Sequence, residues 1–174
     1  MGAGFSLAEV NAMSADAFVR AFGDVAEHSP WVAEAAAEAR PFADRGSMIA
    51  AFSTVIESAD RNRQRQLLLA HPDLAGRAAI AGELTEDSRR EQGGVELDRL
   101  TPEEFARFTA LNAAYRERHR IPFILAVRGA TKHDIMAACA ARMPNDPDEE
   151  FRTALEQVAR IVRFRIEDRV REGD

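Results

Sequence analysis

Helix start signals recur along the whole chain, and each is followed by apolar residues at helical spacing. The clearest is Thr101-Pro102-Glu103-Glu104, which combines an N-cap threonine, a first-turn proline and a capping-box glutamate. Phe108 then follows as part of an apolar face with a period of three to four residues. Further helix starts are predicted at Ser6, Ser14, Ser29-Pro30, Ser47 and Thr131. Alternating strand patterns are nearly absent, so we predict an all-α fold of roughly eight helices in a single compact domain, residues 1–174.

One apolar stretch does not fit a helix. The run from Ile121 to Val127 is short, continuously apolar and interrupted by Pro122, and it is followed by Arg128-Gly129. Proline removes a backbone donor and disfavours a helical conformation at the residue before it. We therefore predict a buried, extended or irregular connection at 121–127.

The last helix is predicted to run from about Asp148 to about Glu172. Its apolar residues fall on one arc of a helical wheel, and Arg165 lies inside that arc. An arginine that faces the core must find an anionic partner or an anionic ligand. A buried salt bridge is the simpler explanation, and a ligand site is the alternative. Arg169 also lies on the arc, but near the chain end it can reach solvent.

Composition excludes several classes of function. The 174 residues carry a net charge of −6, with acidic residues interspersed among the arginines, so nucleic acid is not an expected partner. The single cysteine, Cys139, lies in an alanine-rich helix and is expected to be a small buried residue. No metal-binding, nucleotide-binding, signal-peptide or membrane-spanning pattern is present, so we expect no cofactor, no metal, no membrane and a cytoplasmic protein.

The stretch from His71 to Gly94 carries the most chemistry. His71 follows the apolar run Leu67–Leu69 and precedes Pro72, so we expect it at the end of a helix, in a loop. Thr85 is the predicted N-cap of a short helix that ends at an αL glycine, Gly93. On this helix Ser88, Glu91 and Gln92 are spaced to share one face. Together with the imidazole of His71, the hydroxyl, carboxylate and amide of this face are the groups expected in a small polar pocket.

The other histidines are expected at the surface because His28, His119 and His133 stand in polar surroundings. His71 alone lies between an apolar helix end and a proline. From the residues alone, a histidine in this position somewhat more often caps a helix or packs in the core than acts in catalysis. These features by themselves predict a helical domain with a polar pocket.

The stretch from His71 to Gly94 contains the motifs HPDLAG at 71–76, GELT at 82–85 and S-x-x-EQ at 88–92. These motifs resemble the signature of the 2-oxo-4-hydroxy-4-carboxy-5-ureidoimidazoline (OHCU) decarboxylase family of the urate-to-allantoin pathway. Later blocks match in the same order: Phe108-x-x-Leu111-Asn112-x-x-Tyr115, Pro122-Phe123-Ile124, Val127-Arg128, Arg142-x-x-Asn145 with Glu149 beyond, and Ala154-Leu155 through Arg165-Ile166. Arg118–Ile121 departs from the pattern, since the family usually has a glycine-containing aromatic turn there. Arg77 stands where lysine is common.

The resemblance implies a cofactor-independent decarboxylase that converts OHCU to (S)-allantoin. It implies that His71, Glu91 and Arg165 are catalytic. It also implies that Pro72, Ser88, Gln92, Phe123 and Ile124 contact the substrate, and that the protein is a homodimer. Two alternatives stay open: a helical interaction module with a purely structural pocket, and a relative that acts on another ureido acid.

Overall fold

The computed structural model of the protein describes residues 4–76, 85–97 and 99–173, and over these ranges it is all-α, with nine helices and no strand. The all-α prediction is confirmed, and the described residues alone hold nine helices where roughly eight were expected for the chain. Most of the GELT motif at 82–85, and Arg77, where the family commonly has lysine, lie outside the described residues. None of the described helices is both long enough and apolar enough to cross a membrane.

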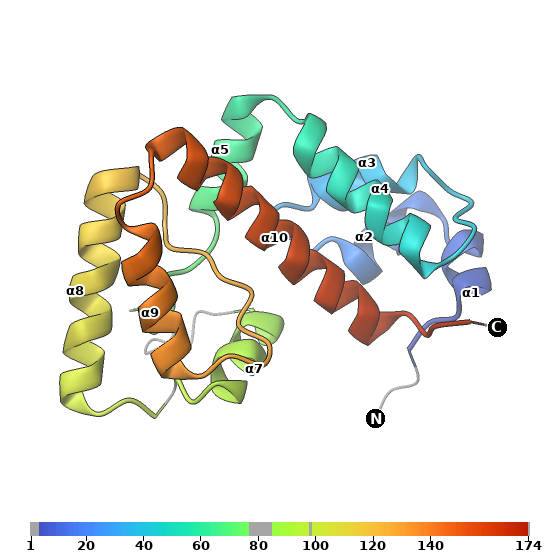
Figure 1. The fold of residues 1–174 in the computed structure, drawn as a ribbon. Coiled ribbons are helices and arrows are strands. Elements are labelled where there is room, and N and C mark those ends of the chain that lie inside the picture. Colours follow the sequence, from blue (N-terminus) through green and yellow to red (C-terminus); the bar gives the residue numbers. More distant parts are fainter. Residues whose placement is uncertain (1–3, 77–84, 98, 174) are drawn as a thin grey trace. The chain divides into compact units, whose positions relative to one another are not determined.

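The chain forms two compact units, residues 1–70 with 158–174 and residues 71–157. The helices of the first unit are α1 (Leu7–Ala12), α2 (Ala15–Phe22), α3 (Trp31–Ala37), α4 (Arg45–Ser58), α5 (Arg61–Leu69) and the C-terminal part of α10 (Pro147–Arg169). The helices of the second unit are α7 (Glu86–Gly94), α8 (Pro102–His119), α9 (Lys132–Arg142) and the N-terminal part of α10 (Figure 1).

Aromatic packing builds the core of the first unit. The ring of Phe18 lies 5.0 Å from that of Phe22 and 6.1 Å from those of Phe42 and Phe52, measured between centroids. These rings belong to α2, α4 and the segment that precedes α4, and α3 packs against both helices. The two chain ends join this unit, because Phe5 N donates to Arg169 O and Arg171 N donates to Phe5 O.

Most predicted helix starts are confirmed, and two are shifted. Ser6, Ser14, Thr85, Thr101 and Thr131 each accept a hydrogen bond from a backbone N–H of the first turn. The fourth helix begins at Arg45 rather than at Ser47, because Asp44 is its N-cap and Ser47 completes the capping box. The third has Pro30 at its N-cap, while the Ser29 hydroxyl donates to Glu27 O instead.

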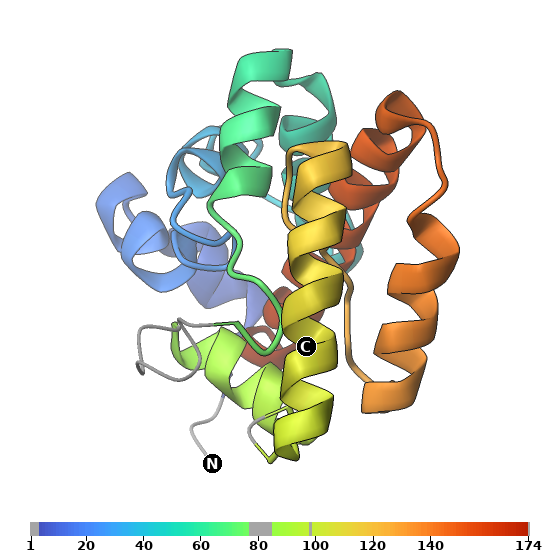
Figure 2. The ribbon, with the colours of Figure 1, turned by 90° about the vertical axis from the view of Figure 1, so that its left-hand side faces the viewer.

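In the second unit, α8 and α9 lie side by side and run in the same direction (Figure 2). Lys132, the first residue of α9, pairs with Glu104 in the first turn of α8, with Nζ and Oε1 2.7 Å apart. At the other end, His119 lies 3.1 Å from the carbonyl oxygen of Met143. The chain must therefore return along the 18 residues of α8, roughly 27 Å, before α9 can begin.

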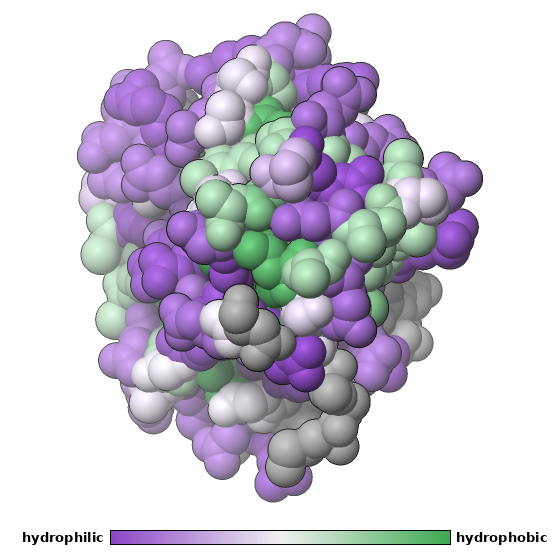
Figure 3. Space-filling view, turned by 90° about the vertical axis from the view of Figure 1, so that its right-hand side faces the viewer, coloured by the Kyte–Doolittle hydropathy of each residue, from purple (hydrophilic) through white to green (hydrophobic). Residues whose placement is uncertain are grey.

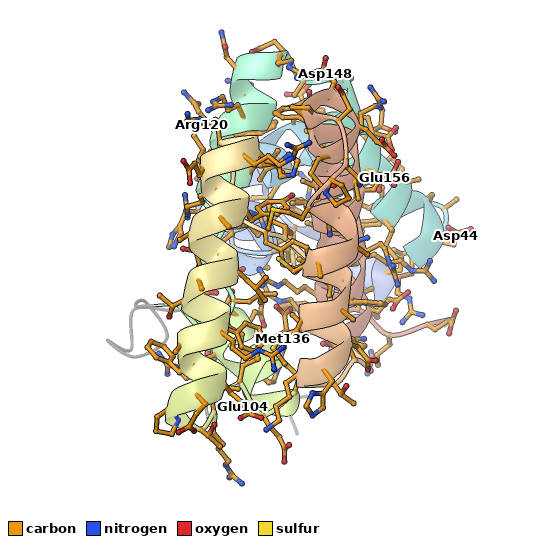
Figure 4. All side chains as sticks on the ribbon, turned by 60° about the vertical axis from the view of Figure 1, so that its left-hand side comes forward. Asp44, Glu104, Arg120, Met136, Asp148 and Glu156 are labelled. Carbon is orange, nitrogen blue, oxygen red and sulfur yellow. The ribbon has the colours of Figure 1, made fainter. Side chains whose placement is uncertain are left out.

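The segment 121–127 makes this return, and the prediction of a buried irregular connection there is confirmed. It has no regular structure, and six of its seven residues are buried. Side chains of α8 and α9 point toward one another across it, with Met136 facing inward and Arg120 at the end of α8 (Figure 4).

Much of the surface in Figure 3 is hydrophilic, with apolar residues gathered near the centre of that view.

Candidate active site

His71 is buried, 6% exposed, two residues after the end of α5. It opens a loop, residues 71–76, that is held by side chains of α7 and α8. Gln92 Oε1 accepts a hydrogen bond of 3.0 Å from Ala75 N, and Asn112 Nδ2 donates one of 2.9 Å to Leu74 O. Gln92, one of the predicted site residues, thus holds the backbone of the loop that carries the histidine.

The predicted polar face of α7 exists. Ser88 and Gln92 are buried, and Glu91 between them is partly exposed. The helix begins at the predicted cap, where Thr85 Oγ1 accepts from Ser88 N at 3.3 Å. The predicted stop is wrong: α7 continues through Gly93, and the left-handed residue is Glu96, with φ of 59°.

Phe123 and Ile124 are both buried in the connection between α8 and α9. Arg142 of α9 holds both, since its Nη1 donates to Ile124 O at 2.7 Å and its guanidinium lies 4.6 Å from the Phe123 ring centroid. The ring of Tyr115 packs edge-on against Phe123 at 5.2 Å. Phe123 and Ile124, which the resemblance assigns to substrate contact and which we call the aromatic wall, are therefore held by side chains of two helices, α8 and α9.

A buried carboxylate, that of Glu150, holds the two side chains that contact the aromatic wall. It was not predicted from the sequence. It is fully buried and accepts hydrogen bonds from the Tyr115 hydroxyl, from Arg142 Nε at 2.7 Å and from Asn145 Nδ2 at 3.0 Å. Burial and the hydrogen bond to Glu150 raise the pKa of Tyr115 well above its ordinary value. The sequence signal for this cluster was Arg142-x-x-Asn145, but the resemblance paired it with Glu149, which is exposed.

Two other expectations meet different outcomes. Cys139 is buried as predicted, and burial raises the pKa of its thiol to about 11, which keeps the thiol protonated. The surface prediction holds for His28 and His133 but is wrong for His119. His119 is buried at the end of α8, where its ring packs 4.6 Å from that of Tyr115.

Arg165 belongs to the first unit, in the C-terminal part of α10. Its side chain is almost fully buried, and Nη1 donates to Glu27 Oε2 at 2.9 Å and to Val25 O at 3.3 Å. The buried salt bridge expected from the helical wheel is present. Glu27, its partner, was not identified from the sequence, because the two residues lie 138 positions apart.

The second unit also has a surface groove of about 550 Å³ between the loop after His71 and α8. Of the predicted site residues, only Pro72 lines it, beside Asp73, Asn112 and Arg116. Within the described ranges, no group of three or more His, Cys, Asp or Glu side chains could hold a metal ion. The predicted residues that share one unit are His71, Pro72, Ser88, Glu91, Gln92, Phe123 and Ile124.

An all-α fold with a buried histidine loop fixed to a polar helix face is compatible with a small enzyme, and comparison with known proteins gives the family. Residues 11–167 match the model of the OHCU decarboxylase family. The chain is 42% identical over 164 residues to the OHCU decarboxylase of Haloferax volcanii, covering 94% of this chain and 95% of that protein. It is 37% identical over 162 residues to the enzyme of the same name from Mus musculus, covering 93% and 91%. This chain belongs to the OHCU decarboxylase family.

A solved structure agrees with this assignment. The crystal structure of an (S)-allantoin synthase matches with a TM-score of 0.76 and 30% sequence identity over 95% of this chain. That protein is longer, and the present chain spans 54% of it.

Proposed function

We propose that this protein decarboxylates OHCU to (S)-allantoin in the degradation of urate. The observation that carries the proposal is the 42% identity to a named OHCU decarboxylase along nearly the full length of both chains. The hydrogen bond from the histidine loop to Gln92 supports it, since it joins two of the three segments that carry proposed site residues in the second unit.

The chemistry of the substrate explains the residue types. OHCU carries a carboxylate and a hydroxyl on one ring carbon, next to a C=N bond. When the bond to the carboxylate breaks, its electron pair forms a C=C bond to the neighbouring carbon, and the C=N electrons move to nitrogen, which takes up a proton. The enol then becomes a carbonyl by losing its hydroxyl proton as the neighbouring carbon is protonated on one face. The substrate itself accepts the electrons, so we propose a reaction without metal or organic cofactor.

We assign the proton transfers to His71, because an imidazole titrates near neutral pH and can both accept and donate. Glu91 would orient this imidazole and accept a hydrogen bond from the substrate. Arg165 would bind anionic oxygens of the substrate through its planar fork of donors. We assign Ser88 and Gln92 to the ureido and ring amides, and Pro72, Phe123 and Ile124 to the walls of the ring site.

We further propose that residues 1–174 act as one domain in a cytoplasmic homodimer. The family resemblance supports the dimer, and light scattering that gave only the monomer mass would refute it.

The first experiment generates OHCU in situ from urate with the two preceding enzymes and follows circular dichroism. Uncatalysed decay gives racemic, optically silent allantoin. The wild-type protein should give a rapid signal of one sign, and His71→Ala and His71→Asn should abolish it. His133→Ala is the matched control, because His133 is exposed on α9 and should be dispensable. A racemic course with folded wild-type protein would exclude the OHCU activity, and other ureido acids would then be tested.

A further inference from the structure

A tight turn lies in the histidine loop, residues 71–76, of the second unit. Gly76 N donates to Asp73 O at 3.1 Å, and Ala75 has a left-handed backbone with φ of 52°. A positive φ at the third of four residues is the pattern of a type II turn, where glycine is preferred. A left-handed conformation is unfavourable for a residue with a β-carbon, and it persists only where the surrounding structure holds it.

Two buried carboxamides hold the central peptide of this turn, between Leu74 and Ala75. Asn112 Nδ2 on α8 donates to Leu74 O at 2.9 Å, and Gln92 Oε1 on α7 accepts from Ala75 N at 3.0 Å. All four residues are buried. Because a backbone carbonyl can only accept and a backbone N–H can only donate, the two bonds fix the direction in which this peptide faces.

The turn is coupled closely to His71. Pro72 lies between His71 and the turn, and its ring fixes its own φ. A residue before a proline is also restricted in its backbone, which applies to His71. Few free torsions therefore separate the imidazole from the Leu74 carbonyl, so a displacement of that carbonyl is passed on to His71.

We propose that Asn112 is a positioning residue for His71: its hydrogen bond to Leu74 O holds the histidine loop so that the imidazole delivers its proton to one face of the substrate carbon. This inference rests on the proposed function. Asn112 acts through the loop and not on the substrate.

A second asparagine supplies a matched control. Asn11 of α1, in the first unit, donates through Nδ2 to Phe42 O at 2.9 Å and accepts from Phe42 N at 2.8 Å. It holds an irregular segment by the same kind of bond, and that segment carries no proposed site residue. Asn11→Ala should therefore lower Tm but leave the kinetics of the folded protein unchanged.

The experiment measures kcat, KM and the enantiomeric excess of allantoin in Asn112→Ala, Asn112→Ser, Gly76→Ala and Asn11→Ala. Thermal unfolding gives the folded fraction of each variant, and enough enzyme is used to make uncatalysed decay negligible. The serine variant is the milder change, because its hydroxyl is a donor on a shorter side chain. Gly76→Ala disturbs the same turn without altering Asn112, since a β-carbon there would lie 2.8 Å from the Asp73 β-carbon.

Asn112→Ala should lower kcat by about 10- to 100-fold per folded molecule, the order expected for a displaced catalytic group. KM should change less, because the groups assigned to substrate binding on α7 remain. The enantiomeric excess should fall, since a displaced imidazole no longer protonates a single face. Asn112→Ser and Gly76→Ala should show the same pattern, whereas a merely structural role would lower Tm and leave kcat and the excess of folded protein unchanged.

Full kcat with an unchanged enantiomeric excess in any folded variant of Asn112 or Gly76 would overturn the inference. Equal losses per folded molecule in Asn11→Ala would also overturn it. In both cases the wild-type protein would still form (S)-allantoin, and the decarboxylase assignment would stand. A wild-type protein without activity on OHCU would overturn both.

Discussion

Replacing Glu150 by glutamine should destabilise the protein strongly. The carboxylate is fully buried and accepts from Tyr115, Arg142 and Asn145. The glutamine side chain has one acceptor oxygen, and an NH₂ group replaces the second carboxylate oxygen. At least one of the three surrounding donor side chains would then face another donor. Loss of one partner of a buried charge pair costs roughly 3–5 kcal/mol. Because the Arg142 side chain keeps 12% exposure to solvent, we expect about 3 kcal/mol, at the lower end of that range.

The assay is chemical or thermal unfolding followed by far-ultraviolet circular dichroism. For a chain of this length, about 3 kcal/mol corresponds to a fall in Tm of roughly 6–12 °C. Glu149→Gln is the control, because Glu149 is the preceding residue on α10, carries the same charge and is exposed. It should stay within about 0.5 kcal/mol of wild type. Equal stability of the two variants would refute the role given to the buried cluster.

Three further predictions concern single residues. Tyr115 is the only tyrosine of the chain, and its pKa is raised in the native protein, so it stays protonated there at a pH above 10.0, the ordinary tyrosine pKa, where the unfolded chain loses this proton. The free energy of unfolding should therefore fall as the pH rises beyond 10.0, and tyrosinate absorbance should appear only with unfolding. Arg120→Gly should stabilise by about 0.5–1 kcal/mol in denaturant titration, since Arg120 has φ of 59° at the end of α8 and a left-handed residue costs more than glycine's added entropy. Cys139, with a thiol pKa of about 11, should resist thiol reagents at mildly alkaline pH until the protein is unfolded, and prompt labelling of native protein would contradict its burial.

Much of the fold follows from local signals in the sequence. Thr101 and Thr131 cap the helices that they were expected to cap, because a hydroxyl three residues before a backbone N–H is a short-range feature. The error at Ser47 is also local, since Asp44 and Ser47 form one capping box and either could be chosen as its start. The stop predicted at Gly93 failed because glycine permits a left-handed turn without requiring one.

The site was predictable only in part, for a physical reason. His71, Ser88 and Gln92 could be found from their short spacing and from the family resemblance. Glu27 and Glu150 could not, because each was recognisable only by its buried arginine partner. The helical wheel showed that Arg165 needed an anion but could not select one of 29 acidic residues. His119 was misplaced because neighbouring arginines suggested a solvent-exposed end, whereas Met143 O and Tyr115 cover its ring.

The irregular connection explains why charged side chains are buried in the second unit at all. Because α8 and α9 run in the same direction, the chain must return between them in an extended form, and in the described residues no strand pairs with it. Its buried backbone groups still need hydrogen-bond partners. Arg142 supplies a donor to Ile124 O, and Gln157 supplies an acceptor to Ala126 N. Arg142 is largely removed from solvent, so its charge requires an anionic partner, and the buried Glu150 is that partner. The topology of two parallel helices thus leads, step by step, to the charged cluster that fixes Phe123 and Ile124, the proposed wall of the substrate site.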